Sequence, residues 1–264
     1  MSSNDRDNHK LLEQVRTGVD ARAPIKACIY AGPGTGKTTF AASIRDALLI
    51  DTEGGSDHVN GQKIRVKTKQ EFDQLLEELL TQDHAFKTVV IDTIDWLQQL
   101  VFDDIAKSAG VKNVQRIEFG RGTADAQAVI AGYLNKLQRL IDNRTNVVLL
   151  AHSMRARVND NPDHQEIDRH QLKLQVNDKG VGVGPMVTEW VDYLLYCSYD
   201  DQFYAEGKGA SKKTRAAESQ DRVMYSVGHT NWMAKARRAI PSKIEMSWSA
   251  LAKAHMNAAK TQEK

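Results

Sequence analysis

Residues 31–38 form a glycine-rich segment that reads AGPGTGKT and directly follows the apolar run KACIY. Gly34 and Gly36 would let the backbone turn so that successive N–H groups point inward at the oxygens of a phosphate. A P-loop consists of a strand, a glycine-rich turn and then Gly-Lys-Ser/Thr at the start of a helix, whose positive N-terminal end also favours phosphate. Ala31 stands where glycine is commoner, and alanine is small enough to fit. The segment therefore predicts a nucleotide site.

Two side chains of this segment would have a direct chemical role. Lys37 would place its charge on the β- and γ-phosphates, and the Thr38 hydroxyl would bind Mg²⁺. The implied cofactors are ATP and Mg²⁺. The predicted nucleotide-binding residues are Gly32, Pro33, Gly34, Thr35, Gly36, Lys37, Thr38 and Thr39.

Three further polar residues follow apolar runs that are typical of strands. Asp92 ends TVVID, Glu53 comes just after LLID, and His152 ends VVLLAH. The carboxyl ends of parallel strands face the same crevice, so we expect all three side chains near the phosphates. Asp92 would hold the Mg²⁺ shell together with Thr38, and Glu53 would orient or deprotonate the attacking water. His152 would sense the γ-phosphate and pass the signal to the segment that follows it.

Plainer roles are open for two of these residues. Asp92, with Asp95 a turn later, also suits the N-terminal cap of a helix that begins near Thr93. His152 also suits a hydrogen-bonded histidine at the end of a strand.

Short β-rich apolar runs alternate with longer helical segments from residue 25 onwards. We expect strands at 25–30, 47–51, 64–66, 88–92, 147–151, 193–199 and 222–227, and helices at 37–46, 69–81, 93–109 and 123–142. This alternation predicts an α/β fold, with a mainly parallel twisted sheet and helices on both faces. Polar stretches at 153–185 and 200–221 are expected to be long loops. The predicted organisation is a polar segment at 1–23, an ATPase domain at 24–248 and a C-terminal helix and tail at 249–264.

The composition is that of a globular protein. Of the 264 residues, 41% are hydrophobic and 27% are charged, and no apolar stretch approaches the ~18 residues that cross a bilayer. The polar start MSSNDRDNHK is not a secretory signal. Cys28 and Cys197 lie in apolar runs, as expected for reduced thiols in the core of a cytoplasmic protein. The net charge of +2 means that any contact with DNA must come from local clusters of basic residues.

The order of AGPGTGKT, IDTEGG, VVIDTID and VVLLAH resembles that of the RecA-like ATPases. The chain looks most similar to the phage-encoded group that accompanies single-strand annealing and recombination functions. The resemblance spans about residues 24–248. It implies a RecA-like P-loop NTPase core, ATP hydrolysis stimulated by DNA, and assembly with copies of the same chain into a ring or a filament. It also implies single-stranded DNA and a phage annealing or single-strand binding protein as partners, no membrane, and the bacterial host cytoplasm as the location.

The resemblance also implies roles for particular residues. Glu53 matches the catalytic glutamate, Asp92 the Walker B aspartate and His152 the γ-phosphate switch. Lys235 and Arg237, ahead of Pro241, match the pair that enters the neighbouring subunit's nucleotide site. The two DNA-binding loops fall at about 113–122 and 153–184. Their predicted DNA-binding residues are Arg116, Arg121, Arg155, Arg157 and Lys173.

Other functions remain open for the same motifs. A hexameric helicase-type motor uses the same core. A small-molecule kinase would need a basic lid over its acceptor, and residues 208–215 are basic enough to resemble one. A nucleotide-dependent binding module would bind ATP with hardly any turnover.

Overall fold

The computed structural model describes residues 18, 20–159, 166–200, 202–206, 213–217 and 219–262. Most of the predicted segment 1–23 lies outside these residues, as do residues 263 and 264 of the predicted tail. For β8, β9 and the last residues of α6, only the backbone is described.

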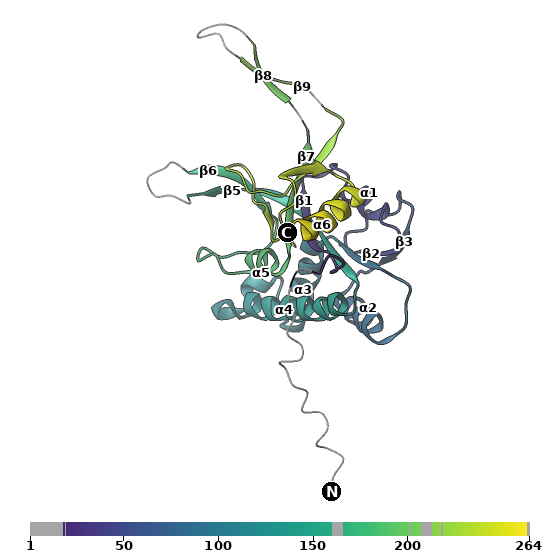
Figure 1. Ribbon diagram of the computed structural model, residues 1–264. Helices are drawn as coiled ribbons and strands as arrows, with labels where there is room; N and C mark the ends of the chain where they lie inside the picture. Colours follow the sequence, from purple (N-terminus) through teal and green to yellow (C-terminus); the bar gives the residue numbers. More distant parts are fainter. Residues whose placement is uncertain are drawn as a thin grey trace.

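A mainly parallel sheet forms the centre of the molecule (Figure 1). Its strands are ordered β12-β10-β7-β1-β5-β4-β2-β3, and every pair from β7 to β3 is parallel. The parallel strands are β1 (Lys26–Ala31), β2 (Ala47–Asp51), β3 (Gln62–Arg65), β4 (Thr88–Asp92), β5 (Asn146–Val158) and β7 (Tyr193–Tyr199). On the far side of β7, the strands β10 (Arg222–Tyr225), β11 (Lys235–Ala236) and β12 (Lys243–Glu245) pair antiparallel, with β10 between β7 and β12.

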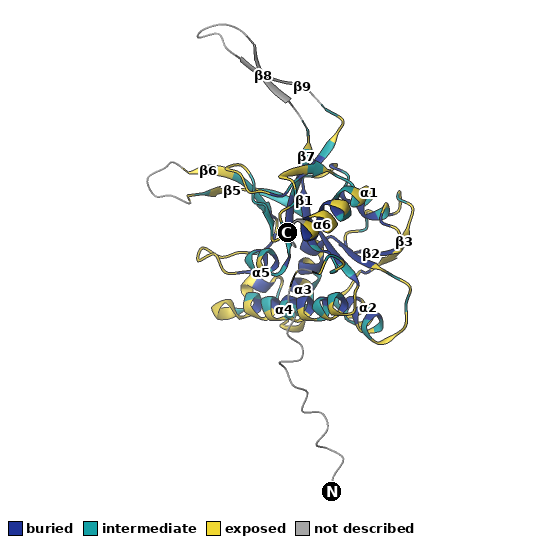
Figure 2. Ribbon diagram, in the orientation of Figure 1, coloured by how far each residue is buried: buried dark blue, intermediate teal, exposed yellow. Residues whose placement is uncertain are grey.

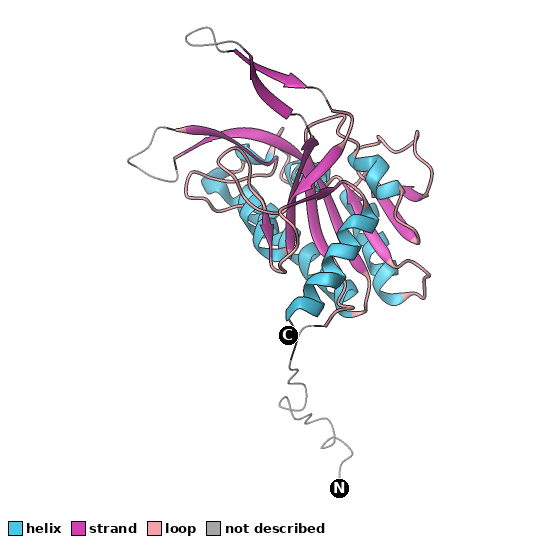
Figure 3. Cartoon of the chain, turned by 45° about the horizontal axis from the view of Figure 1, so that its top comes forward, coloured by secondary structure: helices cyan, strands magenta, loops and turns pink. Residues whose placement is uncertain are grey.

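Helices cover both faces of the sheet, as Figure 3 shows. Successive side chains of a strand point to opposite faces, so one strand supplies two cores. Cys28 and Tyr30 of β1 join a buried cluster with α2 (Lys69–Thr81), α3 (Ile94–Ser108), α4 (Arg121–Asp142) and α5 (Val183–Trp190). Ala27 and Ile29 join the other cluster, with α1 (Lys37–Ala42) and α6 (Trp248–Gln262). The fold is therefore the predicted α/β architecture of a P-loop NTPase core.

Local sequence signals explain where the covering helices begin and which face they bury. The Thr68 hydroxyl accepts the N–H of Glu71 at 3.1 Å, which caps the start of α2. In α4, apolar residues recur at helical spacing, and Ile130, Leu134 and Leu137 are buried in the core as the periodicity predicts. α4 begins at Arg121, two residues before the expected start.

The stretch 153–185 was expected to be a loop, and this prediction is wrong. β5 continues beyond the sheet and pairs antiparallel with β6 (Ile167–Leu172), from Ser153↔Leu172 to Val158↔Ile167. None of residues 153–158 is fully buried, and the hairpin projects from the body of the molecule (Figure 2). Met154, Ala156 and Val158 alternate with polar residues and are half-buried, but this alternation is short and lies within a stretch of mostly polar composition, which favoured the prediction of a loop.

The expected loop at 200–221 is likewise a hairpin in part. β8 (Gln202–Glu206) pairs antiparallel with β9 (Lys213–Ala217), and this pair projects away from the sheet (Figure 1). Polar and basic residues predominate in the stretch 200–221, so it lacks the apolar pattern that predicts a strand.

Two buried side chains attach the C-terminal helix to the sheet. Leu251 of α6 is fully buried, and the Tyr193 hydroxyl lies 2.7 Å from Nδ1 of His255. Nε2 of His255 lies 2.9 Å from the carbonyl oxygen of Ala23, just before β1. In the described part of the chain, no helix has both the length and the apolar character needed to cross a membrane.

Candidate active site

The glycine-rich segment connects the end of β1 to the start of α1, as the motif predicts. Gly34 has φ +74° and Gly36 has φ +93°, a backbone conformation that side chains disfavour. The hydroxyl of Thr35 donates to the carbonyl oxygen of Gly32 at 3.0 Å and closes the turn. The loop therefore has the backbone shape that the predicted phosphate site requires.

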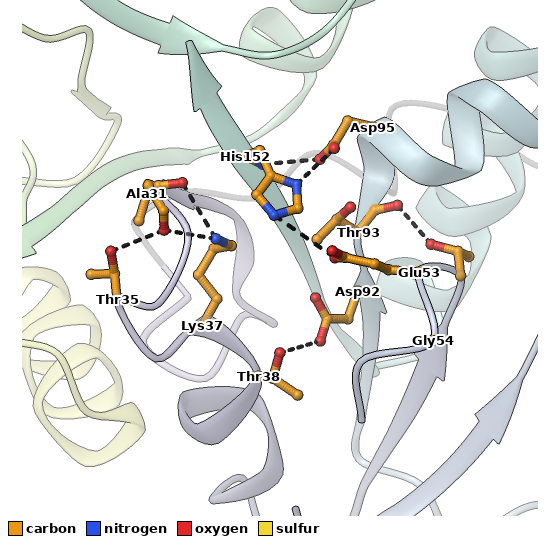
Figure 4. Close-up of polar contacts among 12 residues, drawn as sticks. Ala31, Thr35, Lys37, Thr38, Glu53, Gly54, Asp92, Thr93, Asp95 and His152 are labelled. Atoms are coloured by element: carbon orange, nitrogen blue, oxygen red, sulfur yellow. Dashed lines mark hydrogen bonds and ion pairs between the residues drawn. The ribbon is translucent and has the colours of Figure 1, made fainter. Parts of the chain in front are cut away.

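Lys37 lies along this loop with its ammonium group against the backbone. Nζ donates to the carbonyl oxygens of Ala31 at 3.3 Å and Gly32 at 3.1 Å (Figure 4). The residue is only 7% exposed. Burial lowers the pKa of Lys37, while the charges of Asp92, Asp95 and Glu53 oppose that shift. The ammonium group therefore lies beside the loop, where a further negative charge, such as that of a phosphate, would stabilise its protonated form.

Thr38 and Asp92 meet across the site. The Thr38 hydroxyl donates to Oδ2 of Asp92 at 2.8 Å, so the first turn of α1 contacts the end of β4 (Figure 4). Asp92 is 3% exposed. Burial, with the charges of Glu53 and Asp51, raises the pKa of Asp92 to about 6, although the hydrogen bond from Thr38 opposes this shift.

These two oxygen groups fit Mg²⁺. The ion accepts one or two carboxylates together with substrate phosphates and waters, rather than a cage made of protein side chains. The part of the chain that the structure describes contains no group of three or more His, Cys, Asp or Glu that could hold a metal ion.

Asp51 fixes the turn that carries Glu53. Its carboxylate accepts the N–H of Glu53 at 3.1 Å, the N–H of Ser56 at 3.2 Å and the Ser56 hydroxyl at 2.7 Å. Although burial opposes the shift, the two hydrogen bonds from Ser56 and the one from the N–H of Gly54 hold the pKa of Asp51 below its usual value. Within IDTEGG, only the glutamate, Glu53, was predicted to have a functional role. The signal for Asp51 was an acidic residue at the end of an otherwise apolar strand.

Thr52 joins this turn to the neighbouring strand end. Its N–H donates to the carbonyl oxygen of Asp92 at 2.9 Å, and its hydroxyl donates to that of Thr93 at 2.8 Å. Glu53 is therefore held beside Asp92 while its own side chain stays exposed.

His152 lies between two carboxylates. Nδ1 is 2.8 Å from Oδ2 of Asp95, and Nε2 is 3.8 Å from Oε2 of Glu53 (Figure 4). The main-chain N–H of His152 also donates to Oδ1 of Asp95, at 2.9 Å. Burial opposes the shift, yet the hydrogen bonds from His152 hold the pKa of Asp95 below its usual value. An ionised Asp95 only accepts hydrogen bonds, so Nδ1 carries the proton and Nε2 faces Glu53.

The structure thus places the P-loop beside the carboxyl ends of β2 and β4 and beside His152, which lies within β5 and not at the end of that strand, where it was expected. The family model described as "AAA domain" matches residues 23–238. The chain belongs to the AAA-domain family. It is therefore a nucleotide-binding ATPase, and members of this family generally bind ATP and Mg²⁺. No curated protein matches the chain.

Lys235 and Arg237 of this AAA-domain protein lie away from its own P-loop. Lys235 pairs with Leu194 near the beginning of β7, whereas the P-loop follows the end of β1. Nζ of Lys235 donates to the carbonyl oxygen of Thr188, and Nη2 of Arg237 donates to that of Glu189 at 2.7 Å. In their own chain, both residues contact the C-terminal end of α5.

The predicted DNA-binding residues of the AAA-domain protein also lie outside the nucleotide site, and all are exposed. Arg155 and Arg157 lie on the part of β5 that projects beyond the sheet, and Lys173 follows β6. Instead of an open loop, residues 113–122 contain two short 3₁₀ helices, η2 (Val114–Arg116) and η3 (Glu118–Gly120), and the start of α4. Arg116 ends η2 and Arg121 begins α4.

Proposed function

We propose that this ATPase couples its nucleotide state to the binding of single-stranded DNA, in phage DNA recombination or annealing. One observation carries the proposal. β5 passes through the site at His152 and continues without interruption into the projecting hairpin with Arg155 and Arg157. A change at the phosphates therefore has a direct route to exposed basic residues.

The hydrolysis step assigns one task to each side chain. Lys37 neutralises charge on the β- and γ-phosphates, and Thr38 and Asp92 would hold Mg²⁺, which supplies further neutralisation of the phosphate oxygens. Glu53 accepts a proton from the attacking water while the water oxygen bonds to the γ-phosphorus. The bond from the γ-phosphorus to the bridging oxygen of the β-phosphate breaks, so ADP and inorganic phosphate are the products. Asp51 holds the backbone of Glu53 in place, so the side chain of Glu53 is the part of this residue that would move toward the water.

His152 links this step to the hairpin. Its imidazole faces Glu53 and Asp95, and its carbonyl oxygen accepts the N–H of Lys173 at 2.9 Å. Lys173 directly follows β6, so His152 is bonded to both strands at the base of the hairpin. Loss of the γ-phosphate alters the charge near Glu53 and thereby favours a different position of this ring.

The hairpin offers positive charge without base-specific geometry. Arg157 lies 4.0 Å from Glu166 and 3.9 Å from Asp168. Because its side chain is 78% exposed, these ion pairs contribute little to stability, and the guanidinium can exchange them for contacts with phosphate. Arg155 and Lys173 are also exposed, and Arg116 and Arg121 would extend the path. Spaced cations of this kind bind the phosphate backbone of a single strand with weak sequence preference.

Assembly of several copies, as a ring or a filament, is the second part of the proposal. Arg237 is 55% exposed and lies 3.2 Å from Asp192, so its guanidinium is accessible from outside the chain. Lys235 and Arg237 would enter the nucleotide site of a neighbouring copy and stabilise charge on the transferred phosphoryl group. A phage annealing protein or a single-strand binding protein would be a further partner.

The test measures ATP hydrolysis with and without single-stranded DNA, and DNA binding by fluorescence anisotropy with ATP, with ADP and without nucleotide. We expect DNA to stimulate hydrolysis and the affinity for DNA to differ between the ATP and ADP states. Duplex DNA of the same length is the control. The proposal is contradicted if the rate of hydrolysis is the same with and without DNA and the affinity for DNA is the same in every nucleotide state. That result would favour a kinase or a nucleotide switch.

A further inference from the structure

Arg222 lies directly against the P-loop, although it belongs to β10 and comes late in the chain. A Cβ atom built on Gly36 would lie 2.3 Å from Nη1 and 3.0 Å from Cζ of Arg222. Real Cβ atoms essentially never approach another heavy atom so closely. The guanidinium therefore occupies space that exists only because residue 36, next to Lys37, is a glycine.

Tyr199 holds this arginine over the loop. Tyr199 of β7 and Arg222 of β10 are register partners, and Cζ of Arg222 lies 5.7 Å from the centroid of the Tyr199 ring. The Tyr199 hydroxyl donates to the carbonyl oxygen of Gly34 at 3.4 Å. The two residues therefore contact the P-loop at two of its glycines.

The backbone of Arg222 is fixed on its other side as well. Its carbonyl oxygen accepts the N–H of Met246, just after β12, at 2.8 Å. Since β10 is bonded to both neighbours, Arg222 has a rigid base from which its side chain reaches the loop.

No carboxylate of the described residues neutralises Arg222. Its Nε is buried and has no hydrogen-bond acceptor. Asp200, which follows Tyr199, pairs with Lys243 at 2.5 Å instead. A partly buried guanidinium is costly unless an anion accepts its hydrogen bonds, and its planar fork matches the oxygens of phosphate. The anion that this position is suited to receive is therefore the one that the P-loop binds.

We propose that Arg222, held by Tyr199, binds the phosphate groups of a nucleotide in the P-loop of its own chain. Arg222 thus serves the site in cis, in contrast to the trans role proposed for Lys235 and Arg237. The inference rests on the nucleotide site of the proposed function, so its test must distinguish failure of Arg222 from failure of that site.

The test measures equilibrium binding of ADP and of a non-hydrolysable ATP analogue by calorimetry, and of adenosine by competition, to the full chain with Mg²⁺. Arg222→Gln should weaken binding of both phosphorylated ligands about tenfold or more, the loss expected for a charge-assisted hydrogen bond, and leave adenosine unchanged. The affinity of Arg222→Lys for both phosphorylated ligands should lie between those of the wild type and Arg222→Gln. Lysine keeps the positive charge but lacks the planar guanidinium that can bind two phosphate oxygens at once. Tyr199→Phe should change affinity in the same direction by less. Arg139→Gln, on the exposed side of α4, is the matched control.

Several results would overturn the proposal. Unchanged ADP affinity in Arg222→Gln contradicts it, and an equal loss for adenosine and ADP indicates a structural role instead. Lys37→Ala shows which assignment has failed: if it binds ADP as tightly as the wild type, the nucleotide site itself is wrong. If Arg222→Gln does not fold, Arg222→Lys decides, and wild-type affinity for ADP then contradicts the proposal. Recovery of tight ADP binding on mixing Arg222→Gln with Lys37→Ala subunits would show that Arg222 acts in trans.

Discussion

Asp95 receives two hydrogen bonds from the same residue, His152. The main-chain N–H of His152 reaches Oδ1 at 2.9 Å, and Nδ1 of its ring reaches Oδ2 at 2.8 Å. One carboxylate therefore fixes both the end of the core part of β5 and the orientation of the imidazole. Because Nε2 is then directed at Glu53, the candidate base, the position of His152 and the charge of Glu53 depend on each other.

Replacing Asp95 should separate hydrolysis from the hairpin. In Asp95→Asn the amide keeps the size of the side chain but offers only one acceptor oxygen, so the ring loses its fixed tautomer. We expect ATP hydrolysis to fall by about tenfold, the scale of one charge-assisted hydrogen bond, and the affinity for DNA to become nearly independent of ATP or ADP. Anisotropy in each nucleotide state measures the second effect. Retained nucleotide dependence would show that the coupling does not pass through this pair.

Replacing Glu53 should affect hydrolysis more strongly than replacing Asp95. Glu53→Gln removes the proton acceptor while Asp51 still holds the backbone of the turn, so ATP binding should persist and turnover should fall ~10²-fold or more. Single-turnover hydrolysis and nucleotide affinity are the measurements. If Asp95→Asn slows turnover to this extent and Glu53→Gln does not, Asp95 is the catalytic carboxylate.

The charge of the hairpin should control its binding to DNA. Arg155→Ala combined with Arg157→Ala should weaken binding of single strands of different base composition to a similar degree, with unchanged nucleotide affinity. Two lost phosphate contacts should lower the slope of log affinity against log salt by about 1.4. The matched control is Lys87→Ala with Arg139→Ala, which removes the same charge from exposed positions elsewhere. An unchanged slope would place the DNA path at Arg116 and Arg121 or elsewhere.

Lys235 and Arg237 should act across a subunit boundary. A Lys235→Ala/Arg237→Ala subunit keeps its own Glu53, and a Glu53→Gln subunit keeps intact basic residues. Each alone should be nearly inactive, and mixing them should restore part of the ATP hydrolysis, because one subunit completes the site of the other. If the two variants are shown to co-assemble and their mixture is no more active than the sum of the two alone, the role in trans is contradicted. Both residues would then serve only to bind the end of α5.

His255 should make the stability of the fold depend on pH. Burial lowers the pKa of His255 below its usual value, and the nearby Arg238 adds to this shift. The unfolded chain therefore binds a proton more readily than the folded one as the pH falls through the usual histidine range, near 6.5. The free energy of unfolding of the wild type should therefore be lower at pH 5.5 than above the histidine range. His255→Gln should lose less free energy of unfolding over the same change in pH. Urea midpoints of both proteins at pH 7.5 and pH 5.5 measure the difference, and equal losses would contradict the assignment.

The P-loop and the strand ends were predictable because their signals are local. Gly36, Lys37 and Thr38 are adjacent in the sequence, and the strand–turn–helix context lies within a few residues on either side. The proximity of Glu53, Asp92 and His152 was then predicted from one general property of parallel sheets, that their carboxyl ends share an edge.

The hairpins were missed for an equally physical reason. Periodicity records which side chains a strand buries, and the part of β5 beyond His152 has no fully buried face. Pairing of that segment with β6 depends on backbone hydrogen bonds, which every residue except proline can form. Residues 153–158 do alternate, with Met154, Ala156 and Val158 between polar side chains, but the alternation is short and lies in a polar stretch, so it did not distinguish a projecting strand from a loop.

By itself, the sequence determined that the chain carries a P-loop motif, and it predicted a magnesium-binding pair and a catalytic glutamate beside that loop. Only the tertiary structure decided which distant side chains join that chemistry. Asp95 meets His152 across 57 residues, and the Tyr199 hydroxyl reaches Gly34 across 165. Arg222 reaches Gly36 only because β10 pairs with β7 and β7 lies beside β1. Such contacts depend on the order of the strands in the sheet. That order results from the packing of both cores across the whole domain, so it cannot be read from the local spacing of residues.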